Sequence, residues 1–146
     1  MIGCSGSNAC LQIFANCFEL VDVKIINFTS KITAMKAMFG GCRKIPNIPI
    51  GLDTSKISNF TSAFSNMWEI DSIENINVDS ATNVSSMFLK CYNVKYGMLE
   101  MYNKLLARGS AITNHTRCFE SCGINTAEGR AARALIPQSW GGDAEG

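Results

Sequence analysis

The sequence predicts an α/β protein, a solenoid of about five short rungs, each made of a helix, a turn and a strand. Five of the eight phenylalanines recur at intervals of 25, 25, 24 and 31 residues. Between them, the apolar spacing changes from helix-like to strand-like. One such rung cannot bury its apolar face alone, so stacking is needed to form a core. With 146 residues, 47% of them hydrophobic, the chain fits a single repeat domain over residues 1–146.

The phenylalanines set the register of the repeats. They are Phe14, Phe39, Phe64, Phe88 and Phe119. Three residues after each comes a second column: Cys17, Cys42, Met67, Cys91 and Cys122. This register predicts repeats at residues 7–28, 29–52, 54–77, 79–98 and 111–124, the last of which keeps only its first half.

The third repeat illustrates the expected elements of a rung. Its apolar residues fall at i, i+3, i+7 and i+10, which is one face of a short helix: Ile57, Phe60, Phe64 and Met67. The second repeat adds a strand-like segment in which Ile45, Ile48 and Ile50 are the apolar positions. We therefore expect each rung to pass from helix to turn to strand.

Three segments of these repeats resemble a known family. Residues 29–42, 53–64 and 83–91 are similar to the BspA-like leucine-rich repeats of bacterial surface proteins, and the resemblance covers roughly residues 8–124. It implies a leucine-rich-repeat solenoid with a non-enzymatic surface for adhesion or recognition. Such repeats also occur in phage-encoded proteins.

Two segments depart from the repeat pattern. Residues 98–109 read as a helical insertion with an apolar face, and Gly109 suits its C-terminal stop. Residues 125–140 begin with helix-capping chemistry and reach Pro137, which cannot continue a helix. We expect this second segment, with Ile136 and Trp140, to be a C-terminal cap over the last apolar rung.

Composition disfavours several classes of function. The net charge is +1, without the basic surface of a nucleic-acid binder. No apolar run approaches the roughly 18 residues of a membrane span. A single histidine leaves little capacity for acid–base chemistry, so we expect no enzyme and no cofactor. No signal peptide opens the chain, which predicts synthesis in the cytosol and free thiols for the odd count of seven cysteines.

His115, Cys118 and Cys122 share one face of the helix expected in the fifth repeat. Their spacing could supply metal ligands or a Cys–His nucleophile. However, His115 and Cys122 fall in columns that hold apolar residues in other repeats. The core interpretation is therefore preferred, and no catalytic, cofactor-binding or metal-ligating residue is predicted.

The residue after the cysteine column is the most informative surface position. It is Phe18, Arg43, Trp68 and Tyr92 in the first four repeats. Stacking would align these side chains in a ladder, and aromatic residues and arginine are enriched in binding surfaces. The alternative is that they shield the turn beneath them. We expect a candidate binding ladder, which faces a host or cell-surface ligand if it functions in adhesion.

The first repeat has little sequence to cover it, with Met1 and Ile2 at its start. An exposed rung end favours contact with another protein chain. We therefore expect a non-catalytic recognition or adhesion module within a larger assembly such as a phage virion, as a fibre, decoration or tail-associated protein. The alternatives are a fragment of a bacterial cell-surface adhesin and, remotely, a Cys/His enzyme.

Overall fold

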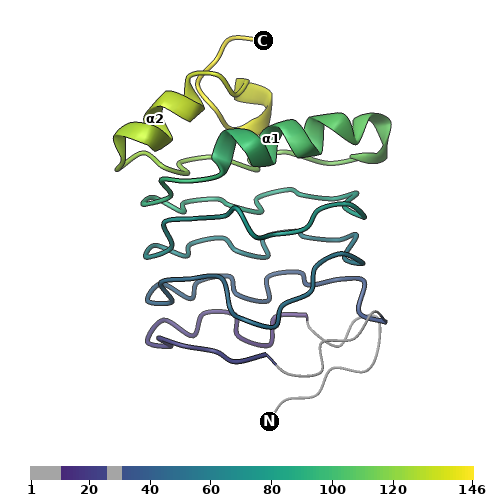
Figure 1. Ribbon diagram of the computed structural model, residues 1–146, viewed down its shortest axis with the longest axis vertical. Helices are drawn as coiled ribbons and strands as arrows, with labels where there is room; N and C mark the ends of the chain where they lie inside the picture. Colours follow the sequence, from purple (N-terminus) through teal and green to yellow (C-terminus); the bar gives the residue numbers. More distant parts are fainter. Residues whose placement is uncertain (1–10, 26–30) are drawn as a thin grey trace.

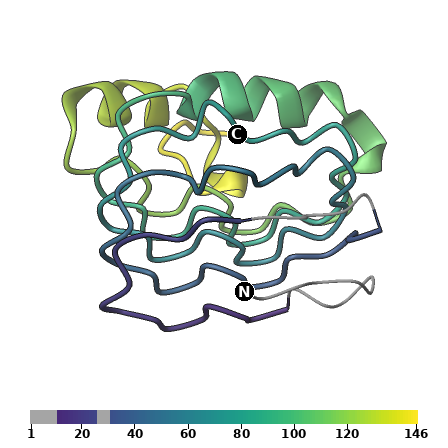
Figure 2. The same cartoon turned by 60° about the horizontal axis from the view of Figure 1, so that its bottom comes forward.

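The chain forms a stack of irregular layers closed by two helices. The computed structural model describes residues 11–25 and 31–146. The layers follow one another from the purple to the green part of the chain, and helices α1 (Met98–Ala107) and α2 (Ala127–Arg133) lie across the C-terminal end (Figure 1). Short 3-10 helices occupy Gly109–Ala111 and Gln138–Trp140. Seen from the other end, the layers are wide loops around a common interior (Figure 2).

The predicted α/β class is wrong. Residues 11–25 and 31–146 contain two α-helices, both outside the regular repeats, and no strand or sheet. Pairing between layers takes the form of isolated bridges, such as Asn59 with Asn83 and Asn83 with Asn114. The chain is therefore not a leucine-rich-repeat solenoid of helix–turn–strand rungs.

Left-handed residues explain why the helix-like spacing gives no helix. Ser62 and Asn66, two residues before and after Phe64, have φ of 54° and 57°. A residue with positive φ cannot continue a right-handed helix. The same two positions are left-handed in all five repeats: Gln12, Asn16, Ala37, Gly41, Ser62, Asn66, Ser86, Lys90, Arg117 and Ser121. The three-residue spacing instead reflects β-turns, such as the one closed by Ala63 N–H donating to the Phe60 carbonyl at 2.9 Å.

Alternate peptide groups join each layer to the next. In the third repeat, the N–H groups of Ser62 and Phe64 donate to the carbonyls of Ser85 and Met87 at 2.9 and 3.1 Å. The peptide groups between them close the β-turns within the layer. Asx turns add support, because the Asn59 side-chain oxygen accepts from Thr61 N–H at 3.0 Å. The backbone is thus satisfied without a sheet.

The phenylalanine column forms a continuous ring stack, which confirms the predicted register. Successive ring centroids lie 5.4, 6.1, 5.8 and 5.7 Å apart with interplanar angles of 6–17°. The rings of Phe39, Phe64, Phe88 and Phe119 are fully buried, whereas Phe14, in the first repeat, is half-buried. This column is the axis of the core.

The C-terminal end is covered by α2 and the residues that follow it. Phe119 N–H donates to the Trp140 carbonyl at 2.8 Å, which continues the layer-to-layer bonding into the cap. Arg133, only 7% exposed, donates to the Phe119 carbonyl at 2.7 Å and forms a bidentate pair with Asp143. Trp140 and Ile136 are buried beneath the helices. At the other end, Met1 and Ile2 lie outside the described residues, so the predicted contact of the first repeat stays a prediction.

Candidate functional site

The structure brings the four predicted ladder residues together on one edge of the stack. Each follows the β-turn that buries the cysteine column, so the layer spacing places the side chains one above the other. The Arg43 guanidinium carbon lies 4.3 Å from the ring centroid of Phe18 and 4.1 Å from that of Trp68. The Trp68 and Tyr92 rings are 5.9 Å apart and tilted by 42°. We call Phe18, Arg43, Trp68 and Tyr92 the ladder.

Both faces of the Arg43 guanidinium are covered by aromatic rings. Phe18 is 42% exposed, and the other three ladder residues are half-buried. Such stacking stabilises the cation by roughly 0.5–2 kcal/mol per ring. The ladder is therefore an ordered surface feature in which one cation is held between two rings.

The Nε donor of Arg43 is unsatisfied. This nitrogen is buried and has no acceptor, and the same is true of Trp68 Nε1. Arg43 makes no side-chain hydrogen bond or ion pair with the described residues, and its side chain is half-buried. Unpaired N–H groups are costly in folded proteins, so these two donors are candidates for an acceptor supplied by a ligand.

The residue after each ladder residue is Glu19, Lys44, Glu69 or Asn93, and three of these four are charged. Lys44 pairs with Glu19 across the first two repeats. Glu69, next to Trp68, makes no ion pair with a described residue. Asn93, next to Tyr92, donates to the Trp68 carbonyl at 2.6 Å. The Arg43 charge thus remains without a direct counter-charge inside the described part of the chain.

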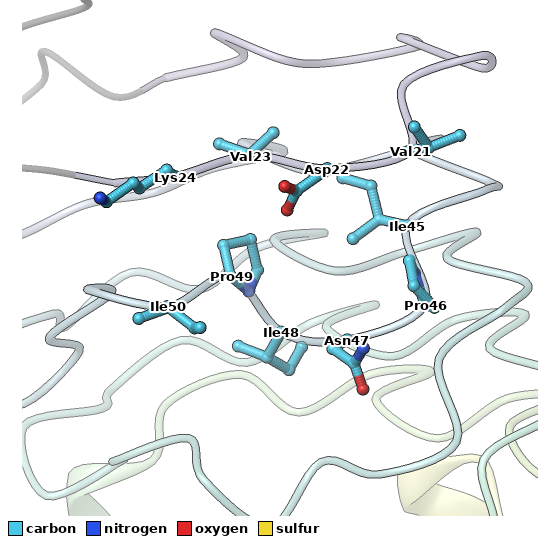
Figure 3. Close-up of a pocket in the computed structure, with 10 residues that line it drawn as sticks. All are labelled: Val21, Asp22, Val23, Lys24, Ile45, Pro46, Asn47, Ile48, Pro49 and Ile50. Atoms are coloured by element: carbon cyan, nitrogen blue, oxygen red, sulfur yellow. The ribbon is translucent and has the colours of Figure 1, made fainter.

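A groove opens between the first and second repeats, a few residues after Phe18 and Arg43. Residues 21–24 and 45–50 line a hollow of about 510 Å³ (Figure 3). Asp22 and Pro49 project into the space between the two segments (Figure 3). Pro46 and Pro49 have no N–H to donate, and the first backbone bond between the segments is Ile25 N–H to the Ile50 carbonyl at 3.3 Å.

Sequence reasoning missed this groove. The signal was present, because two prolines fall inside the segment predicted as a strand, and a central strand does not accommodate them. Val21 and Ile50 at its rim are 62% and 84% exposed. The groove therefore has exposed apolar side chains at its rim.

The structure does not assemble His115, Cys118 and Cys122 into a ligand set. In the described ranges, no group of three His, Cys, Asp or Glu side chains is placed to hold a metal ion. The His115 ring stacks on Trp140 at 4.0 Å, and its Nδ1 donates to the Ser139 carbonyl at 3.1 Å. Cys118 and Cys122 are fully buried, and burial raises the pKa of both thiols, which favours the unreactive thiol form.

The cysteine column packs as small apolar side chains. The five described cysteines are free, as predicted, while Cys4 and Cys10 lie outside the described residues. Cys91 Sγ donates to the Phe64 carbonyl at 3.0 Å. Burial raises the pKa of the Cys91 thiol to about 12 and that of the Cys42 thiol to about 11.

Comparison with known proteins gives one family and no individual relative. None of the helices in the described residues has the length and apolar character to cross a membrane. No curated protein and no solved structure matches the chain. Residues 8–125 match the model of a family described as "Mycoplasma protein of unknown function, DUF285". Because this match spans most of the sequence, the chain belongs to the DUF285 family.

Proposed function

We propose that this chain is a non-catalytic recognition module that binds another protein through the ladder. The observation that carries the proposal is Arg43, held between Phe18 and Trp68 with its Nε donor unsatisfied. Aromatic residues and arginine are the side chains that most often dominate the energy of protein interfaces. The neighbouring groove would supply additional apolar contact area.

The absence of catalysis is part of the same proposal. The thiols that could act as nucleophiles are buried, and burial raises their pKa. The imidazole of His115 is stacked on Trp140 and points Nδ1 at a backbone carbonyl. Neither group is paired with the other as a nucleophile and its base would be.

We further propose that the repeats are related to the BspA-like repeats of bacterial surface proteins, which is consistent with adhesion. Two locations are compatible with such a module: a component of a phage virion and a fragment of a bacterial cell-surface adhesin. The contact expected through the first repeat belongs to this assembly hypothesis. Antibody labelling of intact cells and of purified virus particles distinguishes the two locations.

Site-specific photo-crosslinking tests the recognition role. A photo-reactive amino acid replaces Phe18 in the ladder, and in a matched control it replaces Leu106, a 52% exposed residue of α1. We expect a defined protein to be crosslinked from position 18 and not from position 106. With that partner purified, Trp68→Ala should weaken binding at least tenfold and Leu106→Ala should not. Equal or absent crosslinking from position 18 would contradict the proposal.

A further inference from the structure

We infer that Arg43 recognises a carboxylate on an acidic polypeptide segment of the partner. This inference rests on the proposed function, because it assigns a chemical specificity to the ladder. It follows from three properties of Arg43: the state of its donors, the direction from which they can be reached, and the charges beside them.

The donors of Arg43 are the exception among the arginines of the chain. Each of the other four donates to an oxygen of the protein: Arg108 to the Ala81 carbonyl, Arg117 to Glu120, Arg130 to the Ile124 carbonyl, and Arg133 to Asp143. Among the described residues, the Arg43 guanidinium lies against the rings of Phe18 and Trp68. A half-buried arginine that is ordered by stacking and donates to no oxygen of the described residues is preorganised to receive acceptor oxygens of a ligand.

The direction of approach selects the chemistry of the ligand. Phe18 and Trp68 cover the two faces of the guanidinium, so a ligand reaches it only in the plane of the group. An in-plane fork of N–H donors matches the two oxygens of a carboxylate and offers nothing to an ammonium group. The exposed ring of Phe18 then packs against the apolar or aromatic residues that flank the acidic residue of the partner.

Neighbouring charges tune this site in a way that can be measured. Lys44 is already engaged by Glu19, so it adds little net attraction. Glu69 follows Trp68 in the chain and has no cationic partner among the described residues. Its carboxylate repels an incoming acidic segment, so neutralising Glu69 should strengthen binding if the ligand is anionic.

The test uses the full chain and three polymeric probes of defined charge. A random copolymer of glutamate and tyrosine presents carboxylates beside aromatic rings, a copolymer of lysine and tyrosine presents ammonium groups in the same setting, and polyglutamate presents carboxylates alone. Binding is followed by Trp68 fluorescence in a Trp140→Phe background whose folding is verified by circular dichroism. We expect binding to the glutamate–tyrosine copolymer and not to the lysine–tyrosine copolymer, with polyglutamate weaker than the former.

Two variants separate recognition from support of the fold. Arg43→Lys keeps the charge but loses the planar fork, and it should weaken binding of the glutamate–tyrosine copolymer by about 10-fold or more. Glu69→Gln should strengthen it by roughly two- to threefold, because it removes a negative charge next to Trp68 in the chain. Arg130→Lys is the matched control and should leave binding unchanged.

The carboxylate assignment is overturned by any of three results: no binding of the glutamate–tyrosine copolymer, equal binding of the lysine–tyrosine copolymer, or unchanged binding by Arg43→Lys. In those cases a crosslink from position 18 would still support recognition through the ladder. Failure of the crosslink, with the copolymer result positive, would remove the protein partner and leave the carboxylate site.

Discussion

The two sides of the stack differ in how closely their layers are joined. On the phenylalanine side, alternate peptide groups bond every layer to the next, and the rings stack from Phe14 to Phe119. On the other side, residues 21–24 and 45–50 separate around the groove (Figure 3). Further along this second side the layers are joined again, since Ile73 N–H donates to the Tyr96 carbonyl at 3.1 Å. The difference teaches that the separation is local, beside Pro46 and Pro49, which have no N–H to donate.

The sharpest test of this comparison removes one large apolar side chain from each side. Phe64→Ala should lower the free energy of unfolding by about 3–5 kcal/mol, because it opens a cavity within the ring stack. Ile50→Ala, at a residue 84% exposed beside the groove, should change it by no more than about 0.5 kcal/mol. Urea unfolding followed by circular dichroism measures both. Comparable losses would mean that the groove side carries as much packing as the phenylalanine side.

The close backbone contact between Gly51 and Ile25, where the groove ends, provides the second test. We call this contact the joint. Gly51 has φ of 88°, and a Cβ there would lie 2.2 Å from the Ile25 carbonyl oxygen. Gly51→Ala should therefore destabilise the fold by about 1–3 kcal/mol. Gly109→Ala is the matched control, since Gly109 also has positive φ but no atom within 4 Å of the added carbon. If the two variants were equally stable, the layers would be free to separate at Gly51 and the joint would not matter.

Alkaline pH probes the phenylalanine side through its buried thiols. Burial raises the pKa of Cys91 from 9.0 to about 12, so the folded state holds this proton more tightly than the unfolded chain does. The associated stability is complete below pH 9 and is lost as pH rises from 9 towards 12, by about 1.4 kcal/mol per pH unit for this thiol. Urea unfolding at pH 8, 9 and 10 should show a smaller decline for Cys91→Ala than for the parent chain. Parallel declines would argue against a fully buried Cys91 thiol.

The smallest effect is expected at the ion pair between ladder and groove. Lys44 and Glu19 are both exposed, so solvent screens their attraction. Lys44→Met should change the free energy of unfolding by less than about 1 kcal/mol. Repeating the urea unfolding in 0.5 M sodium chloride should remove most of that difference. A larger, salt-independent loss would show that the aliphatic stem of Lys44 packs on the groove wall.

The fold was predictable in its register and not in its local conformation. The spacing of five phenylalanines was enough to anticipate their contact, and the position after Cys42 was enough to place Arg43 beside Trp68. The helix assignment failed because an i, i+3, i+7 pattern suits consecutive β-turns as well as a helix. Left-handed φ at Ala37 and Ser62 has no sequence signal of the kind that glycine gives.

The candidate site also has a part that the sequence predicts and a part that it does not. Adjacency within the ladder followed from counting residues, whereas the unsatisfied Nε donor of Arg43 depends on where every nearby oxygen lies. The groove had a visible cause in Pro46 and Pro49, because proline cannot join a ladder of backbone bonds. Its size depends on how far the neighbouring layer recedes, which no local pattern specifies.

The layer-to-layer hydrogen bonds around the phenylalanines give this part of the stack an electrical direction. In the turns around the phenylalanines, the peptide groups that join two layers point their N–H toward the C-terminal helices, so their dipoles add along this part of the stack as they do along an α-helix. Outside these turns the direction is mixed, since the N–H groups of Ser58, Thr82 and Thr113 donate toward the N-terminal repeats. In the first repeat, the planar peptide unit that sends the Phe14 N–H to Met38 turns the Ile13 carbonyl the opposite way. Two copies placed first repeat against first repeat would set acceptor against acceptor. Through the turns around the phenylalanines, main-chain pairing between copies therefore favours head-to-tail order, a heterologous geometry that builds rows in place of two-fold dimers.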